Sequence, residues 1–237
     1  MHIKRHVPNM ITLANLLCGC IALIFATKGD FYGAFFFVSL GIFLDFFDGF
    51  FARLFKVSSP LGLQLDSLAD MVTSGVVPGY VMFLMLSGAE DAETLPSFLP
   101  YLGFIVTLGS CFRLANFNID TRQTDSFIGL PTPANALFIL SLPLIKDAGS
   151  MIAFEILINP WVLLLIACCS AYILNAEIPL FSLKVKNFNF RSNALQFSFL
   201  GIALILLILL RFSGVPVVIL AYILLSVVKN RRLKSLG

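Results

Sequence analysis

The residues around which this chain is organised read DFFDGFFAR at 45–53 and GLQLDSLAD at 62–70. They place four aspartates in a sequence that is otherwise strongly apolar: Asp45, Asp48, Asp66 and Asp70. Between the two segments lies SSPLG at 58–62, whose Ser, Pro and Gly residues are typical of a turn. The stretch therefore predicts a helix that ends near residue 54, a turn, and a second helix that begins near residue 66.

The spacing of the aspartates predicts that they meet. Asp45 and Asp48 share one helical face with Gly49 and Ala52, because residues three, four and seven positions apart align on a helix. The second pair of aspartates is four residues apart and aligns in the same way. Each acid in the middle of a bilayer costs at least roughly 2.5–3.5 kcal/mol. Four converging carboxylates therefore predict a positively charged partner between them.

The composition excludes a soluble globular protein. Hydrophobic residues make up 59% of the 237 residues, charged residues only 12%, and the mean hydropathy is +0.95. The apolar runs are continuous, which favours spanning helices over alternating strands. We expect an all-α integral membrane protein, a polytopic bundle of about eight transmembrane helices that forms a single transmembrane domain over residues 1–237. The net charge of +3 is too small to suggest a nucleic-acid partner.

Eight apolar stretches are the expected helices: residues 9–26, 31–54, 66–86, 98–117, 133–145, 151–174, 194–210 and 215–228. Gly75, Pro78 and Gly79 predict a kink in the third of them, and Asn159-Pro160 predicts a break near the start of the sixth.

The positive charges are distributed unevenly along the chain. If the amino terminus is cytoplasmic, every one of the 16 Lys and Arg residues except Lys28, Lys146 and Arg211 falls in a cytoplasmic segment. This asymmetry predicts a multi-pass protein of the cytoplasmic (inner) membrane, with both termini and the acidic stretch at the cytoplasmic face. The basic tail at about 229–237 is then expected to contact anionic lipid headgroups.

The chemistry of the acidic stretch points to metal and phosphate. Sites rich in carboxylate oxygen and poor in nitrogen and sulfur suit hard cations, and four carboxylates can hold two divalent ions, Mg²⁺ or Mn²⁺. Gly49 and Ala52 would let a ligand approach the helix backbone closely. Arg53 offers a cation for a phosphate oxygen. These residues together favour a phosphorylated substrate that is held through metal.

The pattern D-x2-D-G-x2-A-R-x8-G-x3-D-x3-D, which this chain matches at every position from Asp45 to Asp70, resembles the signature of the CDP-alcohol phosphotransferases. The resemblance implies a membrane enzyme with a six-helix core that displaces CMP from a CDP-linked lipid with an alcohol hydroxyl and uses two divalent metals. It implies a metal site of Asp45, Asp48, Asp66 and Asp70, with Asp70 also a candidate general base. It implies CDP contacts by Asn9, Asp48, Gly49, Ala52, Arg53 and Gly62.

Three segments, at residues 8–16, 112–118 and 127–133, resemble the phosphatidylserine synthase branch of that family. The resemblance implies CDP-diacylglycerol and L-serine as substrates, two helices beyond the six-helix core, a membrane-lipid environment and a homodimer. Arg113, Asn118 and Arg122 are then candidates for binding the acceptor or a phosphate. Other acceptors used in the family, such as glycerol 3-phosphate or inositol phosphate, remain alternatives.

Other interpretations of these residues stay open. The aspartates could be solvated charges at the membrane surface, or they could line a path in a cation channel or transporter. Metal-dependent CMP release, compared with ion flux in proteoliposomes, distinguishes an enzyme from a channel. Arg113 and Arg122 could serve only to orient the chain in the membrane.

Overall fold

The computed structural model describes residues 3–57, 59–90, 93, 95–120, 127–148, 151–180 and 194–234. The α-helices of this part are α1 (Ile3–Thr27), α2 (Phe31–Phe55), α3 (Pro60–Asp70), α4 (Val77–Ser87), α5 (Ile105–Ile119), α6 (Thr132–Ser141), α7 (Met151–Leu157), α8 (Pro160–Asn175), α9 (Ala194–Leu210) and α10 (Gly214–Lys234). A π-helix, η1 (Met71–Val76), joins α3 to α4. The 3₁₀ segments are η3 (Leu99–Phe104), η4 (Leu142–Ala148) and η5 (Arg211–Ser213).

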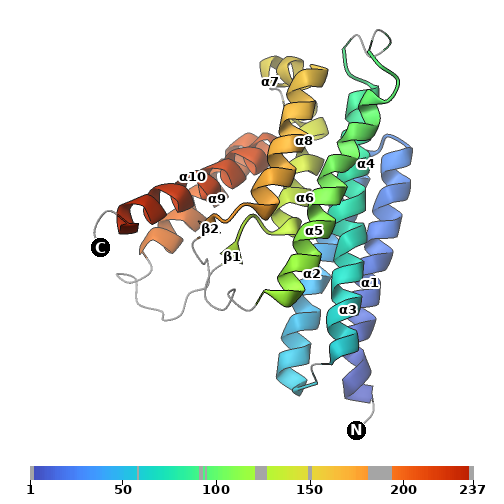
Figure 1. Ribbon diagram of the computed structural model, residues 1–237, viewed down its shortest axis with the longest axis vertical. Coiled ribbons are helices and arrows are strands. Elements are labelled where there is room, and N and C mark those ends of the chain that lie inside the picture. The colour runs from blue at the N-terminus through green and yellow to red at the C-terminus, as the bar shows by residue number, and fades with distance from the viewer. Residues whose placement is uncertain are drawn as a thin grey trace.

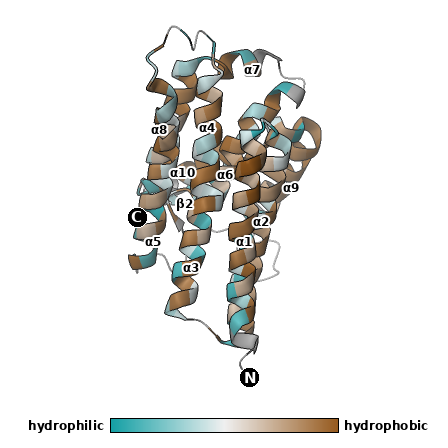
Figure 2. Cartoon of the chain, turned by 90° about the vertical axis from the view of Figure 1, so that its right-hand side faces the viewer, coloured by the Kyte–Doolittle hydropathy of each residue, from teal (hydrophilic) through white to brown (hydrophobic). Residues whose placement is uncertain are grey.

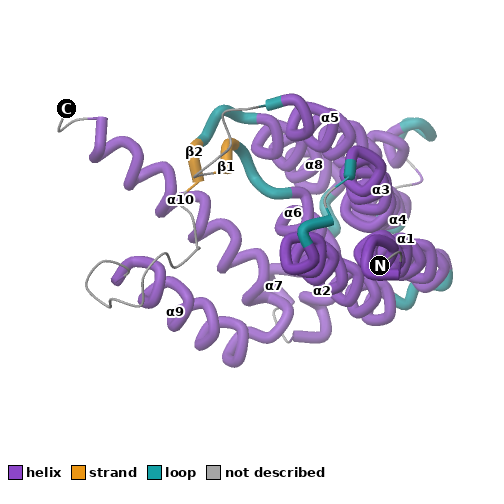
Figure 3. The backbone as a smooth tube through the Cα atoms, turned by 90° about the horizontal axis from the view of Figure 1, so that it is seen from below, coloured by secondary structure: helices purple, strands orange, loops and turns teal. Residues whose placement is uncertain are grey.

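Most of the helices run side by side along one axis. Figure 1 shows α1, α2, α3 with α4, α5, α6 and α8 along the long axis of the molecule, and Figure 3 shows the same bundle nearly end-on. In both views α9 and α10 lie beside the bundle and cross its axis steeply. Apolar residues cover much of the helical surface, whereas hydrophilic ones recur on α3 and near the amino terminus (Figure 2).

The helices are long and apolar enough for a membrane protein. Five stretches could each cross a bilayer by length and composition: His6–Thr27, Phe31–Phe55, Pro60–Ser87, Leu99–Ile119 and Gln196–Lys229. Two shorter apolar helices, Thr132–Lys146 and Pro160–Asn175, accompany them. The predicted all-α polytopic membrane fold is confirmed, and each of the eight predicted stretches contains a helix. Because α9 and α10 cross the bundle axis steeply, their passage through the bilayer stays a prediction.

The second acidic helix begins earlier than the sequence predicted. It starts at Pro60 instead of residue 66, because Ser59 is an N-cap whose Oγ accepts a hydrogen bond from Gly62 N at 3.0 Å. Proline is well suited to the first position of a helix, where its missing N–H would be unpaired in any case. Most of the predicted turn is therefore the first turn of α3. Ser58 lies outside the described residues.

Helix α1 also starts earlier than predicted, at Ile3 instead of residue 9. Pro8 sits near this end of the helix and removes only one backbone hydrogen bond, so the helix passes through it. The predicted end of the next helix is confirmed: α2 stops at Phe55, and Lys56 closes it in the left-handed conformation with φ 54°.

Where the sequence predicted a kink in the third helix, the structure has the π-helix η1. The stretch from Pro60 to Ser87 stays helical throughout, and Pro78 lies in the first turn of α4. The predicted break at Asn159-Pro160 is confirmed, since α7 ends at Leu157 and the Asn159 side chain caps α8 by accepting from Trp161 N at 3.0 Å.

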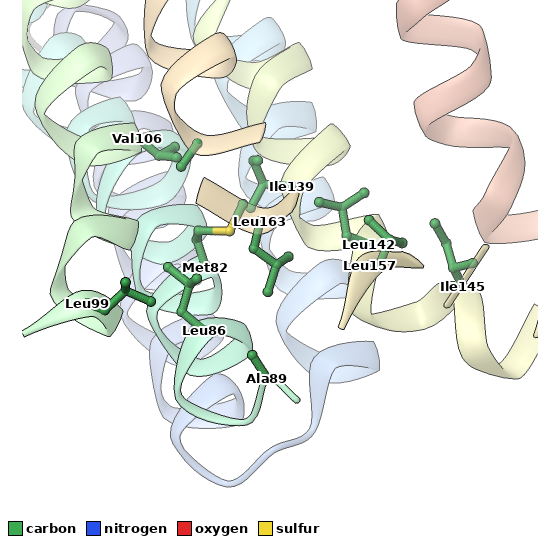
Figure 4. Packing of buried hydrophobic residues seen from close by; sticks show 11 residues of the cluster. Met82, Leu86, Ala89, Leu99, Val106, Ile139, Leu142, Ile145, Leu157 and Leu163 are labelled. Carbon is green, nitrogen blue, oxygen red and sulfur yellow. The ribbon is translucent and has the colours of Figure 1, made fainter. Parts of the chain in front are cut away.

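The core consists of two buried clusters. One lies between α1, α2, α4 and α6 and contains Ala22, Ala34, Val38, Val77, Val81 and Leu140. The other, shown in Figure 4, contains Met82, Leu86, Val106, Ile139, Leu142, Leu157 and Leu163. Together the clusters fix α4 at the centre of the bundle, and α3 at its amino-terminal end lies against α1.

A short antiparallel pair that the sequence did not predict joins β1 (Phe127–Ile128) to β2 (Pro179–Leu180). Gly129 follows it with φ +79°, a conformation that favours glycine, and its N donates to Ile178 O at 2.9 Å. The pair ties the start of α6 to the end of α8.

Candidate functional site

The acidic residues lie at the end of the bundle that carries the amino terminus. Asp45 and Asp48 are in the last three turns of α2, and Asp66 and Asp70 are in α3. Figure 1 shows the carboxyl end of α2, helix α3 and the start of α1 together at this end. The two pairs of acids predicted from the sequence are therefore on adjacent helices, with α1 packed against both.

Three of the four acids form a tight cluster. Asp45, Asp48 and Asp66 each offer a carboxylate oxygen, and these oxygens all lie within 4.8 Å of one another. Within the described part of the chain, the charged neighbours that act on Asp45 are the other three aspartates. Carboxylates at this separation repel one another strongly in a poorly solvated site. The donor set therefore fits a divalent cation bound among the carboxylates.

Helix α1 holds two of the acids through hydrogen bonds. Thr12 Oγ1 donates to Asp48 Oδ2, and Asn15 Nδ2 donates to Asp70 Oδ1 at 3.1 Å. All four side chains are at least nine-tenths buried. The bonds restrict which carboxylate oxygens face the cluster.

Asn15 is itself fixed from two sides. Thr73 Oγ1 in the π-helix donates to the Asn15 backbone oxygen at 3.2 Å. On α2, Gly41 leaves room for the amide, because a Cβ atom there would lie 2.7 Å from Asn15 Oδ1. Helices α1 and α2 and the π-helix thus meet at Asn15.

Thr12 and Asn15 were not among the site residues predicted from the sequence. Asn9, Thr12 and Asn15 follow one another at intervals of three, so they lie along one polar face of an otherwise apolar helix. Polar residues in that position within a spanning helix are a signal of function.

A cavity of about 190 Å³ opens beside the acidic cluster. Its walls include five of the six residues predicted to contact CDP: Asn9, Asp48, Gly49, Ala52 and Gly62. A Cβ atom at Gly49 would meet nothing within 4 Å, which agrees with a glycine that leaves space for a ligand. At Gly62 the glycine instead permits close packing, since a Cβ atom would lie 3.3 Å from Asn9 Oδ1.

The sixth residue predicted to contact CDP, Arg53, does not line this cavity. Its Nε donates to Gly49 O at 3.0 Å, one turn back along α2, and its side chain is exposed. The guanidinium group lies near the site but is directed along its own helix.

The candidate acceptor residues lie on α5. Arg113 is buried, with its guanidinium 5.7 Å from the centroid of the Phe117 ring and within electrostatic reach of Asp120. Asn118 Nδ2 donates to Ser67 Oγ at 2.8 Å, which ties the end of α5 to α3 beside Asp66. Arg122 lies outside the described residues.

Comparison with known proteins gives consistent results. The sequence profile of the family described as "CDP-alcohol phosphatidyltransferase" matches residues 5–173. Three relatives share the name CDP-diacylglycerol–serine O-phosphatidyltransferase. The Bacillus subtilis protein is 36% identical over 129 residues, which are 54% of this chain and 70% of the relative.

The other two relatives are covered less completely. The protein of Helicobacter pylori strain J99 is 30% identical over 142 residues, 59% of this chain and 58% of the relative. That of Methanocaldococcus jannaschii is 31% identical over 134 residues, 56% of this chain and 58% of the relative. Helices α9 and α10 lie beyond the segment that the family profile matches.

Proposed function

The chain belongs to the CDP-alcohol phosphatidyltransferase family, and on this premise we propose that it transfers the phosphatidyl group of CDP-diacylglycerol to the hydroxyl group of L-serine and releases CMP. The observation that carries the proposal is the cluster of Asp45, Asp48 and Asp66 beside a cavity bordered by Gly49 and Ala52. The choice of serine is supported by the name that the relatives share.

The four aspartates are proposed to hold two divalent cations, Mg²⁺ or Mn²⁺. When bound, such cations neutralise a diphosphate and stabilise the departing phosphate oxygen. Thr12 and Asn15 keep Asp48 and Asp70 in fixed orientations for this role. Outer hydrogen bonds of this kind typically affect metal affinity by about 10- to 100-fold.

The nucleotide is proposed to occupy the cavity next to the cluster. Asn9 and Gly62 border it from α1 and α3, and Gly49 and Ala52 let the diphosphate approach α2. Arg53 reaches a phosphate oxygen if its side chain turns away from Gly49 O, to which it now donates.

Asp70 is the proposed general base. Asp70 Oδ1 accepts the hydrogen bond from Asn15 Nδ2, and Asp70 Oδ2 is proposed to take the proton from the serine hydroxyl. The serine oxygen then forms a bond to the β-phosphorus of CDP-diacylglycerol. The bond from that phosphorus to the oxygen bridging the two phosphates breaks, and CMP leaves with the electron pair. Arg113, Asn118 and Arg122 are proposed to bind the serine carboxylate or the lipid phosphate.

We place the site and both termini at the cytoplasmic face of the cytoplasmic membrane, in a single domain that forms a homodimer. The distribution of Lys and Arg supports this orientation, and the amino terminus and the acids share one end of the bundle (Figure 1). Reporters fused after residue 237, one active only in the cytoplasm and one only outside it, test the position of the carboxyl terminus.

The activity is tested with purified protein in vesicles that contain CDP-diacylglycerol. Serine, glycerol 3-phosphate and inositol phosphate are supplied in turn with Mg²⁺ or Mn²⁺, and CMP and the lipid product are both measured. Serine should give CMP and a serine-containing lipid in equal amounts, and chelation of the metal should stop both. Faster turnover with either phosphorylated alcohol would reassign the acceptor, and absence of CMP with all three would refute the proposal.

A further inference from the structure

A second, larger cavity lies away from the acidic site. It has a volume of about 620 Å³ and is lined by residues of α6, η4, α7, α8, α9, η5 and α10. Its lining is dominated by aliphatic side chains such as Leu142, Leu157, Ile166 and Ile223, and none of the described residues in it is acidic or basic. No lining residue is shared with the cavity beside the aspartates.

The cavity adjoins one of the packed cores. Leu142, Ile145 and Leu157 belong both to the cluster of Figure 4 and to the cavity wall, and in that view they lie on the side nearest the carboxyl-terminal helix. The opposite wall comes from α10, outside the segment that the family profile matches. The cavity is therefore formed jointly by the family core and the added helices.

Two polar side chains in this lining, Asn135 and Ser213, have a buried polar atom without a hydrogen-bond partner among the described residues, and Asn135 is the more deeply buried of the two. Asn135 is 1% exposed, and its Oδ1 accepts a hydrogen bond from Ser170 Oγ at 2.6 Å. Its Nδ2 has no hydrogen-bond partner among the described residues. A buried donor without a partner is destabilising and uncommon in native structures. It indicates that an acceptor binds here.

The rim of the cavity is formed by apolar side chains that are exposed on the outer surface of the helices. Ile156, Leu165 and Leu220 line it and are 57%, 63% and 48% exposed. The walls α8 and α10 both belong to apolar stretches that could lie within the bilayer. A molecule can therefore enter from the lipid phase without crossing water.

The volume and the lining of the cavity indicate the chemistry of the molecule that it binds. The volume lies within the roughly 300–1,000 Å³ range of cavities that bury a small ligand, and the lining requires a long apolar group. Water alone fits poorly, because each buried water needs two to four polar partners and the lining offers few. A free fatty acid would bring an unpaired carboxylate to a wall without a cation. An ester-linked acyl chain combines an apolar body with a neutral carbonyl acceptor.

We propose that this cavity binds one acyl chain of an ester-linked bilayer phospholipid, whose ester carbonyl oxygen accepts a hydrogen bond from Asn135 Nδ2. The lipid fills the space between α8 and α10 and so attaches the carboxyl-terminal helices to the bundle. The proposed occupant is a bilayer lipid other than the substrate, in keeping with linings of the two cavities that share no residue.

The test uses the full chain in vesicles of unlabelled phosphatidylcholine with a trace of a phosphatidylcholine that carries a photoreactive group in one acyl chain. Illumination and peptide mass spectrometry then locate the labelled residues. Labelling should concentrate on Phe138, Ile166 and Ile223 and saturate as probe is added. Label spread evenly over exposed lipid-facing residues, without saturation, would overturn the proposal.

An ether-linked probe of the same chain length tests the hydrogen bond. The ester probe should label the cavity about two- to tenfold more than the ether probe, the factor that one neutral hydrogen bond supplies. In Asn135→Leu the two probes should label equally. Equal labelling by both probes in the unaltered protein would overturn the assignment of Asn135.

A pair of substitutions on α10 distinguishes labelling inside the cavity from labelling on the outer surface of the helix. Ile223→Trp adds bulk inside the cavity and should remove the labelling, whereas Leu224→Trp, at a residue that is 64% exposed and outside the lining, should leave it unchanged. Equal labelling in both variants would contradict a binding site here. Competition by CDP-diacylglycerol but not by excess phosphatidylcholine would overturn the bilayer lipid as occupant and assign the cavity to the substrate's own chain.

Discussion

The cavity beside the acids and the apolar cavity contain different kinds of polar groups. Beside the acidic site, Asp48 and Asp70 are buried and each accepts a hydrogen bond from α1, although the aspartates still repel one another. No described residue that lines the apolar cavity is charged, but Asn135 Nδ2 and Ser213 Oγ are without a hydrogen-bond partner there. Excess negative charge requires cations, whereas neutral polar groups require only neutral partners. The first arrangement suits a reaction and the second suits a resident lipid.

The largest expected effect comes from the acids. Asp70→Asn and Asp66→Asn should leave the protein inserted in the membrane while CMP release falls by roughly 10²- to 10⁴-fold, the usual contribution of a general base, or further where a cation ligand is lost. The measurement is CMP release in vesicles at matched protein content. Glu155→Gln, at an exposed acid on α7, is the control that should keep full activity. Near-normal release in either Asp variant would rule out the two-cation site.

Arg113→Ala tests whether α5 binds the acceptor. Loss of a charge-assisted hydrogen bond worth about 1.5–3 kcal/mol should raise the KM for serine by about 10- to 100-fold. The KM for CDP-diacylglycerol should change much less. Arg113→Lys should recover part of the loss. Equal increases in the two KM values would contradict a serine-binding role for this residue.

The hydrogen bonds from α1 should affect metal binding directly. Asn15→Leu and Thr12→Val are each expected to weaken Mn²⁺ affinity by about 10- to 100-fold, as other outer hydrogen bonds to metal ligands do. Titration of the protein with Mn²⁺, followed by electron paramagnetic resonance without substrate, measures this. Thr12→Ser retains the hydroxyl and should restore binding. Ser39→Ala, which removes a hydroxyl bonded to Phe35 O on α2, should have no effect on affinity. Unchanged affinity in Asn15→Leu would show that the bond to Asp70 only stabilises the fold.

The smallest expected effect concerns the apolar cavity. Ile223→Trp should change CMP release by less than about twofold, because well-separated sites that share no partner act nearly independently. Parallel assays of Ile223→Trp and Leu224→Trp measure the difference. A large loss of activity confined to Ile223→Trp would show that the apolar cavity contributes to the reaction and that the two cavities are not independent.

Much of the acidic site was predictable because helical spacing alone aligns its parts. Asp45 with Asp48, and Asp66 with Asp70, lie on shared faces whatever the exact helix boundaries are. That is why an error of six residues at the start of α3 did not alter the prediction that the acids converge. The CDP-contact predictions remain untested as ligand contacts, although five of the six residues line the cavity.

The parts that could not be predicted depend on contacts between distant segments. The bond from Asn15 to Asp70 joins residues 55 positions apart, and that from Asn118 to Ser67 joins residues 51 positions apart. Periodicity describes one helix at a time and says nothing about which face of α1 meets α3. The apolar cavity depends in the same way on how α10 lies against α8, which no local pattern specifies.

The π-helix η1 follows Asp70 directly and interrupts the α-helical repeat between Pro60 and Ser87. The side chains of α3 are therefore rotated about the helix axis relative to those of α4. One residue corresponds to about 100° of rotation in an α-helix. The wider turn of η1 therefore sets how the carboxylates of α3 are aimed relative to the buried face of α4. Removing one residue between Met71 and Val76 would leave α4 packed in its cluster and turn Asp66 and Asp70 away from Asp45 and Asp48. The direction of the acids therefore depends on a local change in helical pitch directly after Asp70.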